Sequence, residues 1–388
     1  MIQQFINLRQ NNIFRWFNLT LSSLLILSLT ACSRPTQVLA QDRMFLDLTV
    51  EFIDEYQIPK TKFAQTPVGG LSAITYDRNT GNFYILSDDR SQNAPARFYT
   101  FALKIQPEGF QAVEIQDVTF LKNANNESFP PGSLDPEGLA LSPRNTLFLS
   151  SEGIPSQEIN PFIAEFDLET GQQVKNLRIP QRYLLNTPEE QENVPRGVQE
   201  NLGFEALTLG IVSVAPQDPF RLFVAPEGAL IQEQDAENRL RLLHYLINPI
   251  GPPVLLSENL YLLDSAPEGT ISNGLTELIA LDREGFLLSL ERTFGLAGAG
   301  AKLFQIATGD ATDTLQYPLL NGDISDIKPL RKKLLLDLRD LGIPLDNLEG
   351  MTLGPRLPDG SSTLLLISDD NFSDNQVTQL LLFKLIEN

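Results

Sequence analysis

The stretch Asn347-Leu-Glu-Gly-Met-Thr-Leu353 is followed, after a turn, by Thr363-Leu-Leu-Leu-Ile-Ser-Asp-Asp-Asn371 and then by Thr378-Gln-Leu-Leu-Leu-Phe-Lys-Leu385. Each piece is a short apolar run of the length of a β-strand, and Gly, Pro, Asn and Asp residues lie between the runs. The first run opens beside an acidic residue, and the second ends in two. Together they form one three-stranded unit.

Four earlier segments repeat this unit. Their first, second and third strands are predicted at 70–77, 82–90 and 97–103; at 135–141, 146–153 and 162–167; at 202–209, 221–228 and 239–247; and at 274–281, 285–292 and 301–306. The anchor residues of the five first strands are separated by 65, 68, 72 and 72 residues, and they are Ser72, Glu137, Glu205, Glu277 and Glu349. Repetition of small all-β sheets at such a period predicts a β-propeller.

The chain also has room for a fourth strand in each unit. Residues 112–120 and 254–262 are examples, whereas the fifth unit ends before its own fourth strand. The segment 45–53 precedes the first unit and would complete the fifth, which closes the ring. We therefore predict five blades closed by an N-terminal strand, with six as the alternative because 307–346 could contain further strands. Within that segment the spacing of 328–341 predicts a short helix, and 181–200 is predicted to be a loop.

The N-terminus has the features of a bacterial lipoprotein signal. Arg9 and Arg15 precede an apolar stretch over 17–30, which ends in Leu29-Thr30-Ala31-Cys32. Cys32 is the only cysteine and stands where a lipobox requires its lipidated residue. A plain signal peptide cut near Ala40 is the alternative. We expect a signal over 1–32, a linker over 33–43 and one domain over 44–388, held at a membrane surface by lipid without spanning it.

The composition limits the possible partners. The net charge is −20, and a chain this acidic repels nucleic acid and anionic lipid. We therefore expect no nucleic-acid partner, a membrane contact only through the lipid at Cys32, and a monomer. Ser33 favours the outer membrane of the bacterial envelope.

The single histidine excludes several chemistries. His244 lies in a strand-like run, where a lone histidine is most simply a partly buried strand residue. One His and no second Cys do not make a zinc site of the usual ligand set, and no Gly-x-Ser-x-Gly motif accompanies His244. Hydrolytic chemistry here would have to use carboxylates, Arg, Lys or Tyr, and a metal.

Acidic residues occur at matching places in every unit. In an antiparallel hairpin the start of the first strand lies beside the end of the second. Glu137 should therefore lie near Glu152, and Glu205 near Glu227. The remaining expected neighbours are Glu277 with Glu291 and Arg292, Glu349 with Asp369 and Asp370, and Ser72 with Asp88, Asp89 and Arg90.

If the first strands line a central channel, these acids meet at one mouth of it. Carboxylates brought together in this way raise one another's pKa or bind a cation, and Ca²⁺ accepts six to eight oxygen ligands in flexible geometry. We predict a Ca²⁺ site from these acids, with Glu137, Glu205, Glu277, Glu349, Arg90 and Arg292 as the residues that act on the substrate. The simpler alternative is that the acids are solvated turn residues or pair with Arg90, Arg97 and Arg292.

Several of these motifs resemble the phytase-like family described as "esterase-like activity of phytase". They are Gly70-Leu-Ser-Ala-Ile, Leu86-Ser-Asp-Asp-Arg90, Asp135-Pro-Glu-Gly-Leu-Ala, Asn201-Leu-Gly-Phe-Glu-Ala-Leu, Leu288-Ser-Leu-Glu-Arg292, Asn347-Leu-Glu-Gly-Met and Ile367-Ser-Asp-Asp-Asn371. The resemblance covers roughly 66–388. It implies a β-propeller with Ca²⁺-dependent hydrolysis of phosphate or related esters.

Two function classes follow from these observations. The first is an envelope-anchored, metal-dependent hydrolase acting on a small ester or phosphoester. The second is a non-catalytic propeller lipoprotein that binds a ligand or a protein partner. Fold alone does not choose between them.

Overall fold

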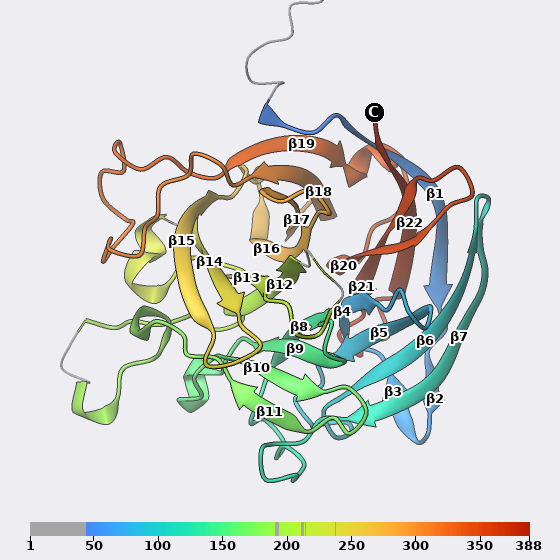
Figure 1. The fold of residues 1–388 in the computed structure, drawn as a ribbon, viewed down its shortest axis with the longest axis horizontal. Helices are drawn as coiled ribbons and strands as arrows, with labels where there is room; N and C mark the ends of the chain where they lie inside the picture. Colours follow the sequence, from blue (N-terminus) through green and yellow to red (C-terminus); the bar gives the residue numbers. More distant parts are fainter. Residues whose placement is uncertain (1–43, 191–193, 211–212, 214, 237) are drawn as a thin grey trace, which may run out of the picture. The chain divides into compact units, whose positions relative to one another are not determined.

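The fold is built from five antiparallel four-stranded sheets arranged around a centre, seen in a computed structural model that describes residues 44–388 except 191–193, 211–212, 214 and 237 (Figure 1). Each sheet is one blade of a propeller. The predicted five blades are confirmed. The segment 307–346, which left room for a sixth blade, contributes a single strand to the fourth.

The strands of each blade run in chain order from the centre outward. Blade one is β4 (Leu71–Tyr76), β5 (Asn82–Ser87), β6 (Arg97–Gln106) and β7 (Gly109–Phe120), and blade two is β8 (Pro136–Leu141), β9 (Thr146–Ser151), β10 (Phe162–Asp167) and β11 (Gln173–Asn176). Blade three is β12 (Phe204–Gly210), β13 (Phe220–Pro226), β14 (Arg239–Ile247) and β15 (Val254–Leu262), and blade four is β16 (Thr270–Ala280), β17 (Phe286–Gly295), β18 (Gly298–Ala307) and β19 (Arg331–Asp337). Blade five is β20 (Asn347–Arg356), β21 (Ser362–Asp369) and β22 (Thr378–Glu387), and its outermost strand is the N-terminal β1 (Leu48–Ile58).

The ring closes as predicted. Strand β1 pairs antiparallel with β22, from Leu48 opposite Glu387 to Ile58 opposite Thr378. A two-stranded hairpin of β2 (Thr61–Phe63) and β3 (Thr66–Val68) then leads the chain to the first blade. Residues 45–388 form one compact unit.

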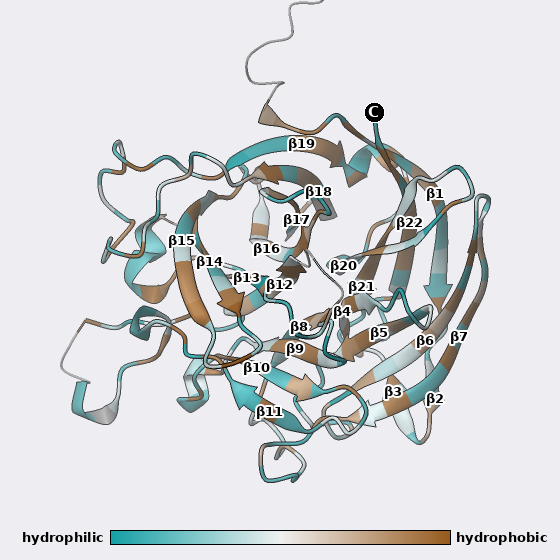
Figure 2. Ribbon diagram, viewed as in Figure 1, coloured by the Kyte–Doolittle hydropathy of each residue, from teal (hydrophilic) through white to brown (hydrophobic). Residues whose placement is uncertain are grey.

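Polarity changes from the inner strands to the outer ones. Strands β5, β9 and β21 are buried along nearly their whole length, and their runs of apolar residues are those of strands covered on both faces. The outermost strands β1 and β7 alternate between half-buried and exposed positions. Figure 2 shows the same trend, with hydrophilic residues concentrated on outer strands such as β11 and in loops.

The hydrophobic core is divided among the blade interfaces. One cluster joins blades two and three around Phe148 and Phe204, and another joins blades five and one around Ile367 and Ile85. Three further clusters fill the remaining interfaces. Burial between blades therefore holds each inner strand in place, and with it the residues at the strand's end.

The remaining regular structure is short. Five 3-10 helices lie in the described part of the chain: η2 (Pro155–Gln157), η3 (Gln181–Tyr183), η4 (Pro188–Glu190), η5 (Ile231–Ala236) and η6 (Leu338–Leu341). The predicted loop over 181–200 contains η3 and η4. None of the helices in the described residues is long and apolar enough to cross a membrane.

One predicted element is wrong. The segment 328–341, predicted as a helix, forms strand β19 and then the single turn η6. Its Leu and Lys spacing fits a helix, but the open edge of β18 offers a ladder of backbone hydrogen bonds, and the segment pairs with it from Lys302–Asp337 to Ala307–Arg331. Tertiary pairing has overridden the local pattern.

The predicted signal, linker and lipidation site at Cys32 fall in 1–43 and lie outside the described residues. His244 lies on β14 and is partly buried, as predicted.

Candidate functional site

Each inner strand contains a β-bulge, which lies near the start of the strand in blades one, two, three and five and further along β16 in blade four. The register between the first and second strands of a blade shifts at this point in all five blades. Bulges redirect a side chain and are frequent beside active sites. The residues at the shift are Ser72, Glu137, Glu205, Thr276 and Glu349.

A second set of equivalent residues lies on the second strand of each blade or just after it. Each of them comes directly after the residue that pairs with the last inner-strand residue before the bulge. In blade three, for example, Phe204 pairs with Pro226, and Glu227 comes next. Four of these residues are acidic and one is basic: Asp88, Glu152, Glu227, Arg292 and Asp369. Eight of these ten residues line one opening, as the hairpin geometry predicted, and Ser72 and Thr276 do not.

Blade four departs from the predicted alignment by one residue. Thr276, and not Glu277, occupies the bulge, and Glu277 pairs with Leu290. The positions equivalent to Glu277 in the other blades hold Ala or Gly. Glu277 is buried below the mouth, where its Oε1 accepts hydrogen bonds from the backbone N–H groups of Leu207 (3.1 Å) and Leu278 (2.9 Å).

The opening is a cavity of about 860 Å³. Nine carboxylates and two guanidinium groups line it, from Asp88, Asp135, Glu137, Glu152, Glu205, Glu227, Asp346, Glu349, Asp369, Arg90 and Arg292. Seven of the eleven predicted metal-binding acids are among them. Asp89, Glu277, Glu291 and Asp370 lie outside the lining.

These four acids have partners in the surrounding structure. Asp89 forms a buried ion pair with Arg97 (2.8 Å) and accepts hydrogen bonds from backbone N–H groups. Burial opposes this ionised state, but these hydrogen bonds hold the pKa of Asp89 below its ordinary value. Glu291 accepts hydrogen bonds from Tyr261 (2.5 Å) and Lys332, and Asp370 accepts from the N–H of Gly70 (2.8 Å). Each therefore links neighbouring segments of the propeller.

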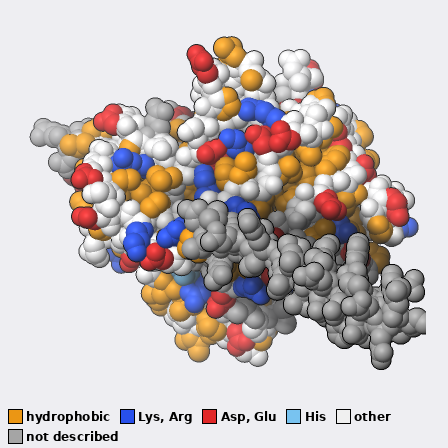
Figure 3. Space-filling view, turned by 90° about the horizontal axis from the view of Figure 1, so that it is seen from above, with side chains coloured by type: hydrophobic (Ala, Val, Ile, Leu, Met, Phe, Trp, Pro, Cys, Tyr) orange, Lys and Arg blue, Asp and Glu red, His pale blue; other side chains and the backbone are white. Residues whose placement is uncertain are grey.

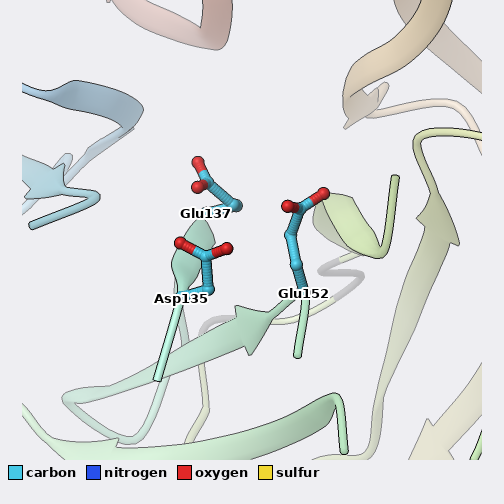
Figure 4. A group of neighbouring side chains, drawn as sticks. All are labelled: Asp135, Glu137 and Glu152. Carbon is cyan, nitrogen blue, oxygen red and sulfur yellow. The ribbon is translucent and has the colours of Figure 1, made fainter. Parts of the chain in front are cut away.

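Two clusters of carboxylates form the floor of the cavity. One is Asp135, Glu137 and Glu152, and the other is Glu152, Glu205 and Glu227; within each, one oxygen per residue lies within 4.8 Å of the others. In Figure 4 Asp135 and Glu137, at the start of β8, lie beside Glu152, at the end of β9. Because Glu152 belongs to both clusters, the floor is one continuous patch of oxygen ligands that could hold a cation.

Burial and mutual repulsion both raise the pKa of several acids at the cavity. For Glu137, Glu152 and Glu205, burial is the largest cause, and neighbouring carboxylates add to it. Burial raises the pKa of Glu349 to about 8 and that of Asp369 to about 7. The full set cannot be ionised at neutral pH without added positive charge.

The two arginines supply part of this charge. Arg90 donates from Nε to Asp135 Oδ1 (2.6 Å) and from Nη2 to Asn201 (2.9 Å). Arg292 forms ion pairs with Glu227 (2.7 Å) and Glu349 (3.3 Å) and donates to Asn347. The lining therefore has two guanidinium groups and nine carboxyl groups, so acidic groups greatly outnumber basic ones.

Three buried polar atoms at the cavity have no hydrogen-bond partner within the described residues: the acceptors Asp88 Oδ1 and Asp135 Oδ2 and the donor Arg292 Nε. Of the two acceptors, Asp135 Oδ2 lies in an ion pair with Arg90 Nη2 (2.5 Å). A buried polar group without a partner costs free energy. A bound ligand could therefore place a positive group beside Asp88 Oδ1 and a hydrogen-bond acceptor beside Arg292 Nε.

Several lining residues were not predicted from the sequence. Asp135 directly precedes β8, Asn347 begins β20, and Asn201 lies in the turn before β12. All three lie within motifs already quoted, so the motifs could have pointed to them. Others come from segments whose sequences give no such signal. Ser272, Phe294 and Ala299 lie on strands of blade four, and the remaining residues lie in loops: Leu345, Asp346, Asn371, Ser373, Asn375 and Gln376.

The fold and site define a five-bladed propeller with an acidic cavity at one mouth of its channel. The family model described as "Phytase-like: Esterase-like activity of phytase" matches residues 66–372. The chain belongs to this phytase-like family.

Comparison with solved structures gives only distant likenesses. A GH62 hydrolase in complex with xylotriose shares 11% identity over 86% of this chain and 97% of its own, with a TM-score of 0.45. A GH62 alpha-L-arabinofuranosidase from Coprinopsis cinerea shares 12% over 88% and 98% (TM-score 0.40), and the Dos1 propeller shares 6% over 82% and 69% (TM-score 0.34). No curated protein matched the chain.

Proposed function

We propose that this protein is a Ca²⁺-dependent hydrolase of phosphate or related esters, anchored to the bacterial envelope by lipid at Cys32. One observation carries the proposal: two buried carboxylate clusters share Glu152 on the floor of a cavity that is large enough for a small substrate. Membership of the phytase-like family supports the same class of reaction.

The residues present fit a hard cation. All the charged ligands offered are carboxylate oxygens, which suit Ca²⁺, and the unpartnered Asp88 Oδ1 is a further acceptor at the same cavity. Asp135, Glu137, Glu152, Glu205 and Glu227 would hold the metal. When bound, Ca²⁺ would polarise a phosphoryl oxygen and favour ionisation of a nearby water.

The arginines would bind and orient the ester. Arg90 and Arg292 line the same cavity, and guanidinium groups suit the oxygens of a phosphate group. Arg292 Nε is free to donate among the described residues, and Asn347 helps to hold its guanidinium group in place. In the overall reaction the oxygen of water bonds to phosphorus, the ester P–O bond breaks, and the departing alcohol takes the proton.

The test uses the purified full-length chain and a panel of phosphomonoesters, phosphodiesters and carboxylic esters, with Ca²⁺ and with EDTA. We expect Ca²⁺-dependent turnover, which Glu152→Gln lowers at least about 100-fold because it removes the shared ligand charge. Glu165→Gln is the matched control, since Glu165 is a buried acid of the same blade that pairs with Lys175.

Two results would count against the proposal. Turnover that survives both EDTA and Glu152→Gln would remove the metal from the reaction. Tight Ca²⁺ binding without turnover of any ester would leave the non-catalytic binding propeller as the better description.

The envelope anchor needs a separate measurement. Cys32→Ser should release the chain from the membrane fraction of bacteria that express it, because the only lipidation site is lost. A variant that stays in the membrane fraction would contradict the anchor without affecting the proposal for the cavity.

A further inference from the structure

Blade four is the blade whose inner hairpin continues well beyond the acidic ring. In the other blades only one or two residue pairs precede the bulge. In blade four the pairing of β16 with β17 extends from Leu275–Glu291 up to Thr270–Gly295. The extension, 270–274 with 292–295, therefore forms a raised wall beside the mouth.

The pairing decides which side chains of this wall face the cavity. Gly274 lies opposite Arg292, and Ser272 lies opposite Phe294. Alternate residues of a strand share a face, and Arg292, Phe294 and Ser272 all line the cavity. Phe294 is thus one step above the arginine that would grip the phosphate.

The opposite face of the wall is fixed in position. Thr293 accepts a hydrogen bond from Arg339 Nη2 (2.9 Å), and Arg339 lies so close to Gly300 that a Cβ there would be 2.3 Å from its Nε. Arg339 belongs to η6 and so ties the wall to the segment that precedes blade five. These contacts support the face of the wall opposite to Phe294.

The upper level of the cavity is apolar on this side. Phe294 is 51% exposed although it lines the cavity. Ala299, its partner on β18, and Leu345 line the cavity as well. Below these residues, Glu227 of blade three reaches the foot of the wall, where it forms an ion pair with Arg292 (2.7 Å). The cavity therefore joins a charged floor to an apolar upper wall, and an amphiphilic ligand fits both.

We propose that the substrate is an ester whose hydrolysable group carries an apolar aryl or alkyl group, which contacts Phe294, Ala299 and Leu345. The proposal rests on the hydrolase function above and names its substrate class. A polyol carrying many phosphates has no apolar part for this wall, and each additional phosphate would meet the excess of carboxylates. Burial of an aryl group against Phe294 provides the binding free energy.

The experiment compares two phosphomonoesters with the same reacting group, 1-naphthyl phosphate and glycerol 2-phosphate, using the full-length chain with Ca²⁺. We expect a KM for the naphthyl ester about tenfold below that for the glycerol ester. Phe294→Ser should raise the naphthyl KM about tenfold, which corresponds to about 1.4 kcal/mol, and change the glycerol KM less than twofold. Phe294→Leu should restore the naphthyl KM. Leu296→Ser is the control, because Leu296 is 89% exposed in the turn that follows β17 but does not line the cavity.

Other outcomes would overturn the proposal. Equal changes for both esters in Phe294→Ser would make Phe294 merely structural. If Leu296→Ser and Ile271→Ser lower binding to phosphatidylcholine vesicles while Phe294→Ser leaves both KM values unchanged, the hairpin contacts lipid instead.

Failure of the hydrolase function can be told apart from failure of this proposal. If the unmodified chain hydrolyses neither ester, calorimetry with 1-naphthyl phosphate and Ca²⁺ measures binding directly. Binding that Phe294→Ser weakens about tenfold would support the apolar wall without catalysis, whereas equal binding by the two chains would reject it.

Discussion

Glu277 combines an unusual position with a clear set of partners. Its carboxylate lies between the inner strands of blades three, four and five, where it accepts hydrogen bonds from the backbone N–H groups of Leu207 and Leu278. The N–H of Met351 on β20 also contributes. Burial raises the pKa of Glu277 well above its ordinary value, and these N–H groups oppose the rise. One side chain thus satisfies donors from three blades.

Removal of this carboxylate should loosen the centre of the propeller. Glu277→Ala leaves three buried N–H groups without their acceptor, and we expect the free energy of unfolding to fall by about 2–4 kcal/mol. Glu277→Gln keeps one acceptor oxygen, so its free energy of unfolding should fall by about half as much as that of Glu277→Ala. Urea unfolding of the three chains measures both values, and an alanine variant within 0.5 kcal/mol of the original would refute this role.

His244 should make folding stability depend on pH. Burial, and then the charge of Arg221, lowers its pKa to about 4. Arg221 Nη1 lies 3.1 Å from its Nε2, Ser257 Oγ lies 3.4 Å from its Nδ1, and the ring stacks on Phe223. The folded chain therefore takes up the proton less readily than the unfolded chain, whose histidine titrates near 6.5.

The sign follows from proton binding. Between about pH 6.5 and 4 the unfolded state holds a proton on His244 that the folded state lacks, so stability falls as pH falls and levels off below about 4. Because the ring is only partly buried, we expect about 1–2 kcal/mol. Urea unfolding measures the free energy of unfolding at pH 7 and at pH 4.5. Between these two pH values it should fall less for His244→Gln than for the original chain. Equal falls would show that His244 is not the group responsible.

The difference between Glu277 and the other anchors shows where prediction from the sequence stopped. Repeat spacing placed Glu137, Glu205 and Glu349 correctly at the bulges, but a bulge can move by one residue without changing that spacing. A better signal was the next residue: the true bulge residues Glu137, Glu205 and Glu349 are followed by Gly or Ala, whereas Glu277 is followed by Leu278. Gly138 shows the reason, since a Cβ there would lie 2.4 Å from the backbone oxygen of Glu205.

At the scale of elements, the sequence predicted what repeats and missed what occurs once. The five hairpins and the closing strand β1 follow from a recurring apolar pattern, and they are present. The sequence predicted a helix in place of β19, because its Leu and Lys spacing also suits a helix. The segment is a strand because it pairs with the free edge of β18, which its own sequence does not reveal. The raised part of β16 and β17, which carries Phe294, has no counterpart in the other repeats and so could not be found by comparing them.

Strand β1 should be essential to the fifth blade. Its backbone pairs with β22 over ten residue positions, and its loss exposes the unpaired edge of a long apolar strand. A chain that begins at Lys60 should aggregate or form dimers in size-exclusion chromatography. A chain that begins at Met44 is the control and should remain monomeric.

The outcome for the shorter chain has a direct check. A synthetic peptide of residues 46–58, added in excess, should bind the chain that begins at Lys60 and restore the monomer. If that chain is already monomeric and as stable as the control, β1 is not needed for closure.

At the scale of the whole molecule, charge is distributed unevenly. On the face shown in Figure 3, acidic and basic side chains are interspersed, whereas the cavity gathers nine acids around two arginines. Repulsion inside the cavity opposes folding, because the five blades bring the acids together only in the folded state. A cation that binds there should therefore stabilise the entire ring.

Calcium should raise the melting temperature of the EDTA-treated protein by several degrees. A ligand that binds only the folded state raises the free energy of unfolding by about 2.7 kcal/mol when its free concentration is a hundred times Kd. Differential scanning calorimetry in Ca²⁺, against KCl of the same ionic strength, separates binding from general screening. Glu152→Gln should abolish most of the rise, and an equal rise in KCl would exclude a specific site.

The pairing of β1 with β22 also has a consequence for how the protein is made. Gln379 donates to Glu55 across 324 residues of sequence. The first of the described strands to leave the ribosome, β1, therefore cannot pair until the last of them, β22, has been synthesised. Contacts between such distant parts of a chain form slowly, and a product cut short by a premature stop codon would have no partner for β1. Synthesis of β22 therefore acts as a checkpoint, and only a chain translated as far as this strand can complete the ring and bring all its acids together.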